Sequence, residues 1–287
     1  MNKKNMARIF PIRLFEDNYA YLVCSPFSGR SCLIDPADVN KVLDFLSNFK
    51  NLTINHILYT HKHWDHASGS KNLFNILNEK YPYSKPVFIA HKHELDTIEH
   101  VDIPLEENGA FDSGDFIVKH YHVPCHTLGH VLYRFKIATL ESDFKTEFPD
   151  NIDFYFESDD FMFTGDTIFI GGCGRFFEGN AEQMLKNMDL VAGLDENLHI
   201  FPGHEYTLKN LKWAISVDKN NSYISQKIDE LSKMKDVISI PSTVKQEKQM
   251  NLFMKCHEKY LQDIIGIHSP VKLMNKLREL KNENKGI

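Results

Sequence analysis

Length, composition and charge limit what the chain can be. Its 287 residues suit one large domain, alone or with a small appendage, and 42% hydrophobic with 25% charged residues is typical of a globular protein. A formal net charge of -6 provides no general basic field, which argues against a nucleic-acid partner. Five cysteines without regular spacing argue against a disulfide framework and favour a reducing, cytoplasmic location. We also expect no membrane partner, because no apolar run reaches the length of a membrane span and the N-terminus lacks a signal-peptide core.

The first hundred residues predict strands and helices in alternation. Runs rich in apolar and β-branched residues predict strands at 9–14, 19–24, 31–35, 54–59 and 86–90. Apolar residues at helical spacing predict helices at 39–49 and 67–78. The polar run 91–94 is expected to begin a short helix, with His91, His93 and His100 exposed.

The middle of the chain predicts further strands and one helix. A hairpin is expected at 111–123 with its turn at 112–114, followed by a strand at 131–137 and a polar insertion at 141–153. The aromatic runs 154–156 and 161–163 are expected to pair across 158–160. A helix is predicted at 180–191, with Asn180 as its cap.

Beyond residue 205 the character of the sequence changes. Helical stripes occur at 208–217, 224–234 and 271–280, and Pro241-Ser242-Thr243 is placed to cap a further helix. No run there shows the clean alternation of a strand. The sequence therefore predicts an α/β domain at 1–205 and a small α-helical domain at 206–287.

Three imidazoles and one carboxylate occupy a short loop after the predicted strand 54–59. They are His61, His63, Asp65 and His66, at the carboxyl end of a strand, where open α/β folds place their chemistry. Imidazole and carboxylate suit zinc, or iron in some settings. His61 and His63 are two residues apart and can serve one ion, while Asp65 and His66 diverge and can serve a second. A loop of surface histidines is the alternative, but this spacing of four ligand types makes it a poor one.

Three later segments each end an apolar run in a small residue followed by a metal-ligand residue type. They are Pro124-Cys125-His126, Thr164-Gly165-Asp166 and Pro202-Gly203-His204. Together with the first loop, and in this order, they resemble the metallo-β-lactamase superfamily, which implies an αββα sandwich. The runs 172–179, 203–207, 210–212, 241–243 and 251–254 and the closing helix narrow the resemblance to glyoxalase II, the hydroxyacylglutathione hydrolase family. Only 81–100 and 141–153 are poorly matched.

The resemblance implies a binuclear metal thioesterase. His61, His63 and His126 would hold one divalent ion, Asp65, His66 and His204 would hold the other, and Asp166 would bridge them. Asp65 and Asp166 would thus belong to the catalytic centre, with a metal-bridging hydroxide as nucleophile. Zinc is the first expectation, with iron or manganese as alternatives. The substrate would be S-D-lactoylglutathione or another 2-hydroxyacyl thioester of glutathione, and the products a 2-hydroxy acid and glutathione.

The resemblance also implies glutathione contacts from Arg175, Tyr206, Arg278 and Lys281. Arg278 and Lys281 lie three residues apart on one helix face, where they could hold one carboxylate together. The alternative is a solvated charged face. Phe177 stands where the family commonly has tyrosine, so one hydroxyl is missing from the expected site.

Other polar residues carry weaker predictions. His56 is expected in the core, and His120 and His122 share one face of a strand without completing a ligand set. Cys125 and Cys173 are expected to pack rather than to bind metal. His130 could be structural or support a ligand, and Asp35 could support a ligand histidine or merely end a strand.

Two other functions remain open at the level of the sequence. One is a persulfide dioxygenase with a single iron and no long helical appendage. The other is a non-enzymatic or nucleic-acid-processing relative, which the full ligand set and the acidic charge disfavour. The sequence gives no indication of the oligomeric state.

Overall fold

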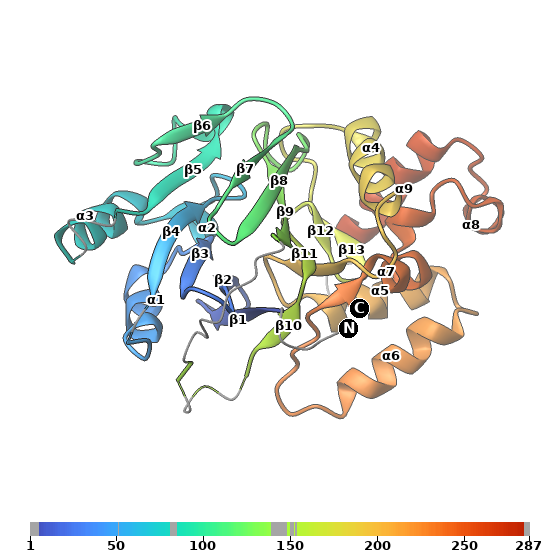
Figure 1. Cartoon of the computed structure of the whole chain (residues 1–287). Helices are drawn as coiled ribbons and strands as arrows, with labels where there is room; N and C mark the ends of the chain where they lie inside the picture. The colour runs from blue at the N-terminus through green and yellow to red at the C-terminus, as the bar shows by residue number, and fades with distance from the viewer. Residues whose placement is uncertain are drawn as a thin grey trace. The chain divides into compact units, whose positions relative to one another are not determined.

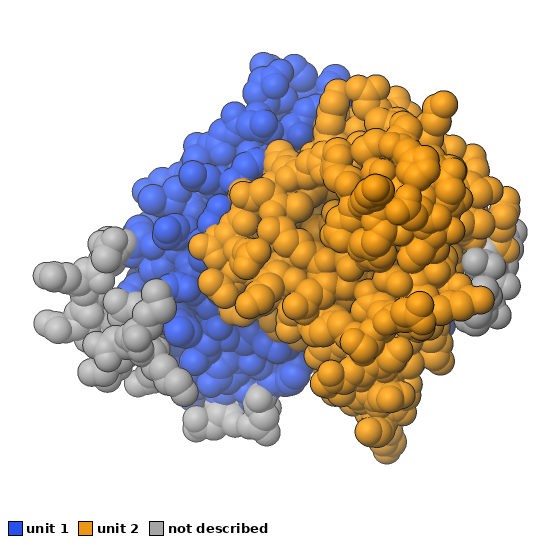
Figure 2. Space-filling model, turned by 90° about the vertical axis from the view of Figure 1, so that its right-hand side faces the viewer, with its two compact units in different colours: residues 1–122, 129–163 blue, residues 123–128, 164–287 orange. Residues whose placement is uncertain are grey.

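The chain folds into two compact units in a computed structural model that describes residues 6–50, 52–80, 85–138, 148–149, 152 and 154–283. Unit 1 comprises Met1–His122 and Gly129–Phe163, and unit 2 comprises Val123–Leu128 and Thr164–Ile287, as coloured in Figure 2. Most of the predicted insertion 141–153 lies outside the described residues. The division into domains at residue 205 stays a prediction.

Unit 1 contains a seven-stranded mixed sheet (Figure 1). In spatial order its strands are β10 (Phe156–Ser158), β1 (Ala7–Arg13), β2 (Tyr19–Cys24), β3 (Arg30–Ile34), β4 (Thr53–Leu58), β5 (Val87–His91) and β6 (Ile103–Leu105). The strands from β10 to β3 pair antiparallel, whereas β3 to β6 are parallel. The carboxyl ends of β3 and β4 therefore meet at one edge, which brings Asp35 beside the predicted metal loop.

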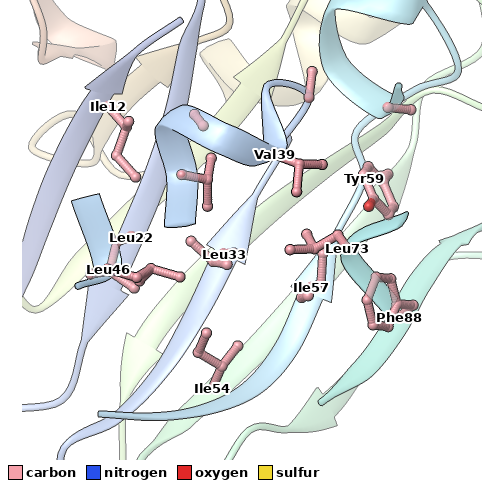
Figure 3. Packing of buried hydrophobic residues seen from close by; sticks show 14 of the residues in the cluster. Ile12, Leu22, Leu33, Val39, Leu46, Ile54, Ile57, Tyr59, Leu73 and Phe88 are labelled. Atoms are coloured by element: carbon pink, nitrogen blue, oxygen red, sulfur yellow. The ribbon is translucent and has the colours of Figure 1, made fainter. Parts of the chain in front are cut away.

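Helices cover one face of this sheet. They are α1 (Val39–Leu46), the single turn α2 (Trp64–Ala67) and α3 (Ser70–Lys80), and the 3-10 turn η2 (Lys92–Glu94) follows β5 in the chain. Val39 and Leu46 of α1 and Leu73 of α3 pack with Leu33 and Ile57 of the sheet, as Figure 3 shows. The predicted helices at 39–49 and 67–78 are thus confirmed, although the second is split by Gly69, whose φ is +72°.

Unit 1 also carries strands of a second sheet. These are β7 (Gly109–Asp112), β8 (Phe116–His122), β9 (Val131–Ile137) and β11 (Asp160–Gly165), whose last two residues belong to unit 2. The predicted hairpin is the antiparallel pair β7–β8. The prediction that 154–156 and 161–163 pair with each other is wrong. Strand β10 pairs with β1 and β11 pairs with β9, because the segment between them carries the chain from one sheet to the other.

Unit 2 is largely helical. Its elements in chain order are the two-stranded β12 (Ile168–Phe169) and β13 (Gly172–Cys173), then α4 (Ala181–Ala192), β14 (His199–Pro202), α5 (Thr207–Val217), α6 (Ser222–Ser232), β15 (Ser242–Thr243), α7 (Val244–Met250), η3 (Leu252–Lys255), α8 (Lys259–Ile265) and α9 (Pro270–Glu283). Asn180 and Thr243 cap α4 and α7 as predicted, each in a reciprocal capping box.

The sequence did not predict five short elements of unit 2. They are the two-residue strands β12 and β13, which pair with each other, the two-residue strand β15, which pairs with β14, and the helical segments η3 and α8. Their length gives no periodic signal. Among the described residues, no helix has both the length and the apolar character that crossing a membrane requires.

Candidate metal centre

The predicted metal loop of unit 1 runs from the end of β4 into α2. His61 and His66 are fully buried, and their ring centroids lie 4.2 Å apart. His61 Nε2 and His63 Nδ1 are separated by 3.0 Å. This is close to the roughly 3.3 Å that separates two imidazole nitrogens on one tetrahedral zinc ion. The loop therefore brings ligand-type nitrogens together at the spacing that one cation needs.

Asp35 holds this loop from the neighbouring strand. Its carboxylate accepts hydrogen bonds from the Thr60 backbone N–H and hydroxyl, both at 2.7 Å, and from His66 Nδ1 at 2.9 Å. Donation from Nδ1 fixes the tautomer of His66 and leaves Nε2 as its lone-pair nitrogen. Asp35 does this from a strained backbone, with φ at +49°. It supports a predicted ligand and does more than end a strand.

Asp65 is also held in place within unit 1. Asn18 Nδ2 donates to Asp65 Oδ2 at 2.9 Å, and His66 Nε2 lies 3.9 Å from the same oxygen. One side of the carboxylate is thus oriented by an amide.

Unit 2 carries the other three predicted ligands. The two oxygens of Asp166 face different imidazoles, with Oδ2 3.4 Å from His126 Nε2 and Oδ1 3.4 Å from His204 Nε2. All three residues are buried. His126 Nδ1 donates to the Arg175 carbonyl at 3.0 Å, which leaves Nε2 as its lone-pair nitrogen. A carboxylate placed between two imidazoles in this way can bridge two cations.

The glycines around Asp166 are required by close approach. A Cβ at Gly174 would overlap the Asp166 backbone oxygen and lie 2.8 Å from His126 Nδ1. Gly165 has φ at +45°, and its carbonyl accepts the Gly203 N–H at 2.9 Å. The residues immediately before Asp166 and His204 are therefore joined by the backbone.

Cys125 and Cys173 are packing residues, as predicted. Both are buried, and burial raises the pKa of the Cys125 thiol to about 12 and raises the pKa of Cys173 as well. Among the described residues, neither thiol belongs to a group whose ligand atoms lie close enough together to share one ion.

Arg278 and Lys281 of α9 point into unit 2. Arg278 Nη1 donates to the Cys173 carbonyl at 3.0 Å, and Lys281 Nζ donates to Asn210 Oδ1. Lost hydration, and then the neighbouring Arg278 charge, lower the pKa of Lys281 to about 7. The two cationic side chains thus lie beside strand β13, which contains Cys173, and do not form a fully solvated face.

The other predicted glutathione contacts lie in the same unit. Tyr206 stacks on His204 with ring centroids 4.6 Å apart, and Phe177 lies 5.2 Å from the His126 ring. The Phe177 side chain is 58% exposed, and the Arg175 side chain is also exposed. Tyr206 therefore lies next to the predicted ligand His204, whereas Phe177 and the Arg175 backbone lie next to the predicted ligand His126.

The remaining histidines divide into confirmed and corrected predictions. His93 is exposed, as predicted, whereas His56, expected in the core, is only partly buried in β4, where its Nδ1 lies 2.6 Å from Ser113 Oγ. The prediction that His91 is exposed is wrong. Its ring is buried, stacks on His122 and bonds the Glu106 carbonyl at 2.8 Å, which the polar sequence around it concealed. His100 is half-buried against Phe74, not exposed.

Comparison with known proteins places the chain in a family. Residues 14–140 match the family described as metallo-beta-lactamase superfamily, and residues 205–284 match the one described as hydroxyacylglutathione hydrolase C-terminus. The cytoplasmic hydroxyacylglutathione hydrolase of Arabidopsis thaliana is 32% identical, over 97% of this chain and 100% of that protein. The hydroxyacylglutathione hydrolase of Pelagibacter ubique is 35% identical, over 85% and 91%. The chain belongs to the hydroxyacylglutathione hydrolase family.

Solved structures agree on the fold. A metallo-beta-lactamase from Staphylococcus aureus superposes with a TM-score of 0.58 at 20% identity, covering 96% of this chain and 71% of that one. ETHE1 from Myxococcus xanthus gives 0.55 at 18%, covering 94% and 96%. The predicted metallo-β-lactamase fold with a C-terminal helical part is therefore confirmed, and the family makes the chain a thioester hydrolase.

The residues present fit the divalent metal that the superfamily implies. Groups of histidine and aspartate able to hold an ion occur among the described residues, and they draw on all seven predicted ligands. Neutral imidazole and carboxylate are the donor types of zinc, iron and manganese sites. The donor set therefore favours a divalent cation without selecting one.

Proposed function

We propose that the chain hydrolyses S-(2-hydroxyacyl)glutathione, with S-D-lactoylglutathione as the first candidate, at a binuclear metal centre. The observation that carries the proposal is Asp166, whose two oxygens face different imidazoles, His126 and His204. A mononuclear site needs no such arrangement. The names of the relatives support the substrate class.

In this proposal the seven predicted ligands would hold one pair of ions. His61, His63 and His126 would hold one ion, Asp65, His66 and His204 would hold the other, and Asp166 would be shared. Zinc is the first candidate, and iron and manganese are alternatives that the same donors accept.

When bound, two such cations acidify water and polarise a carbonyl oxygen. The protein keeps the ligating nitrogens available. His66 donates its Nδ1–H to the Asp35 carboxylate and His126 donates its Nδ1–H to the Arg175 carbonyl, so both rings present Nε2 as the lone-pair nitrogen. The leaving thiolate of glutathione needs little proton assistance, since a thiol pKa is about 8.5. No side-chain acid is then required at the sulfur.

We assign glutathione binding to Arg175, Phe177, Tyr206, Arg278 and Lys281. In the predicted division of the chain, the helical domain 206–287 therefore contributes most of these contacts, and residues 175–177 contribute the others. Domain 1–205 supplies the metal ligands. Glutathione carries two carboxylates, which call for local positive charge in an acidic protein. Arg278 and Lys281 supply this charge beside Gly172, where a Cβ would lie 2.7 Å from Lys281 Nζ. Phe177 offers an apolar ring at the position where the family commonly has a tyrosine, whose hydroxyl could bond glutathione.

The decisive experiment follows loss of thioester absorbance from S-D-lactoylglutathione, with metal content measured in the same sample. We expect hydrolysis with two ions per chain, loss of activity with a chelator, and recovery on adding zinc. Oxygen consumption with glutathione persulfide and one iron per chain would support the dioxygenase instead. If a metal-loaded protein shows neither of these two activities, the assignment is overturned.

A further inference from the structure

A buried carboxylate outside the predicted ligand set holds the metal loop of unit 1. Glu94, at the end of η2, has a side chain only 1% exposed. Its Oε2 accepts the Lys62 backbone N–H at 2.7 Å, and its Oε1 accepts the Gly129 N–H at 2.6 Å. Both bonds are charge-assisted and short, the strong class of hydrogen bond. One side chain thus satisfies two backbone donors that are 67 residues apart in the numbering of the chain.

The two backbone positions are significant for the metal ligands. Lys62 lies between His61 and His63, so its peptide sets the direction of both side chains. Gly129 follows His126 by three residues and precedes His130, whose ring stacks on His61 with centroids 4.8 Å apart. The same two segments are also joined by the Val131 N–H and the Thr60 carbonyl at 2.9 Å.

The fit around Glu94 leaves little freedom. A Cβ at Gly129 would overlap the Glu94 carboxylate, so the glycine is needed for this contact. Glu94 also begins a turn of its own, because its carbonyl accepts the Ile98 N–H at 3.0 Å. The carboxylate is therefore anchored at its backbone while it holds the two loops at its tip.

We propose that Glu94 is a positioning residue for the metal centre: it fixes the Lys62 peptide and so sets the angle between His61 and His63. This inference rests on the proposed function, because it takes those histidines as ligands. Glu94 contacts no reacting atom. It acts on metal affinity through the loop, in the way that partners of ligands elsewhere are worth about 10- to 100-fold in affinity.

The test compares Glu94→Gln with a matched control in the same unit. Glutamine keeps the shape but turns an NH₂ group toward one of the two backbone donors, leaving it unsatisfied. Asp115→Asn is the control, since Asp115 is also buried but holds Ser25 and Ser28 instead of the metal loop. Zinc dissociation constants are measured by chelator competition on protein whose fold is verified by circular dichroism. We expect an increase of about 10- to 100-fold for Glu94→Gln and a change within about twofold for Asp115→Asn.

A second measurement needs no variant. In the metal-free wild-type protein, the Lys62 and Gly129 amides should exchange slowly with deuterium although both lie in loops. Unprotected amides at both positions overturn the proposal, as does an unchanged zinc affinity in folded Glu94→Gln. Neither readout uses a thioester. A protein that binds zinc as expected but leaves S-D-lactoylglutathione intact would refute the proposed function alone.

Discussion

Asp166 is the residue on which the binuclear proposal depends most. Replacing it by asparagine preserves its shape but removes one negative charge and one ligating oxygen. We expect the metal content to fall below two ions per chain. Thioesterase activity should fall by more than the roughly 10- to 100-fold that loss of a supporting partner costs. Elemental analysis and steady-state kinetics on the same preparation measure both.

His56 provides the control for that experiment. It is a histidine of β4 bonded to Ser113 and lies outside the predicted ligand set. His56→Gln should leave the metal content unchanged. A normal ion content in Asp166→Asn, or a halved one in His56→Gln, would show that the ligands are wrongly assigned.

We expect Lys281, as a proposed substrate contact, to give substrate binding a pH dependence. The pKa of its ammonium is lowered to about 7 by lost hydration and by Arg278. A carboxylate bound to Lys281 would favour the charged form and raise that pKa again. KM for a glutathione thioester should therefore rise above pH 7, by up to about tenfold per pH unit until the pKa of the complex is reached.

The measurement is KM between pH 6 and pH 9 in the wild type and in Lys281→Met. At low pH the variant should have a higher KM than the wild type, and its KM should not change with pH. The KM of the wild type should also be independent of pH for a thioester that lacks glutathione's carboxylates. A flat wild-type profile with the glutathione thioester would return Lys281 to a purely structural role.

Helix α7 contributes a buried acid to unit 2. Glu247 is fully buried, and its Oε2 accepts the Gly171 N–H at 2.9 Å and Asn251 Nδ2 at 3.0 Å. Asn251 in turn donates to the Gly172 carbonyl at 2.9 Å. The helix thus holds the tight turn between β12 and β13, which precedes Arg175. Burial raises the pKa of Glu247 from 4.5 to about 7.

This shift makes stability fall as pH rises. Between pH 4.5 and 7 the folded chain keeps a proton that the unfolded chain has lost, so the free energy of unfolding decreases across that window. The loss is complete above pH 7 and amounts to about 3 kcal/mol at most, since one pKa unit is about 1.4 kcal/mol. Glu247→Gln should be the more stable protein at pH 8 and close to the wild type at pH 4. Urea unfolding of the metal-free protein across this range checks it, and parallel profiles for the two proteins would contradict it.

The elements that the sequence predicted well are those with a long periodic signal. Strands β1 to β4, helices α1, α4, α5 and α9 and the cap at Asn180 follow from apolar spacing and local hydrogen-bonding chemistry. The strand with which a given strand pairs cannot be predicted from such local signals. The aromatic runs near 155 and 162 offer equally apolar faces to each other and to β1 and β9, and only the tertiary structure decides between them.

At the candidate site, local spacing predicted the metal loop from His61 to His66, whereas the assignment of His126, Asp166 and His204 as ligands came from the family resemblance. Asp35 remained ambiguous, and Glu94 was missed, because both act through hydrogen bonds to residues distant in the chain. The run His91-Lys92-His93-Glu94 reads as solvated, yet the structure buries its first and last members. Burial of a polar side chain depends on partners that no local pattern reveals.

For the molecule as a whole, the proposed ions should be part of its stability. A ligand that binds only the folded chain adds RT ln(1 + [L]/Kd), which is about 2.7 kcal/mol when the free metal exceeds its dissociation constant a hundredfold. The thermal midpoint should rise with free zinc and fall with a chelator. Asp166→Asn should respond less than the wild type. Scans at several buffered zinc concentrations measure this, and a wild-type midpoint indifferent to zinc would argue against the centre.

The burial of all five cysteines has a consequence for the chemical durability of this enzyme. None is paired, and burial is the main cause that raises the pKa of each of them. Exchange with disulfides requires an accessible thiolate. With the proposed substrate the enzyme would release glutathione and work beside that thiol's oxidised form, which would form mixed disulfides with any exposed thiolate. We expect an aromatic disulfide reagent to titrate no cysteine of the native protein and five after unfolding, so that a cell under oxidative stress would keep this activity unmodified.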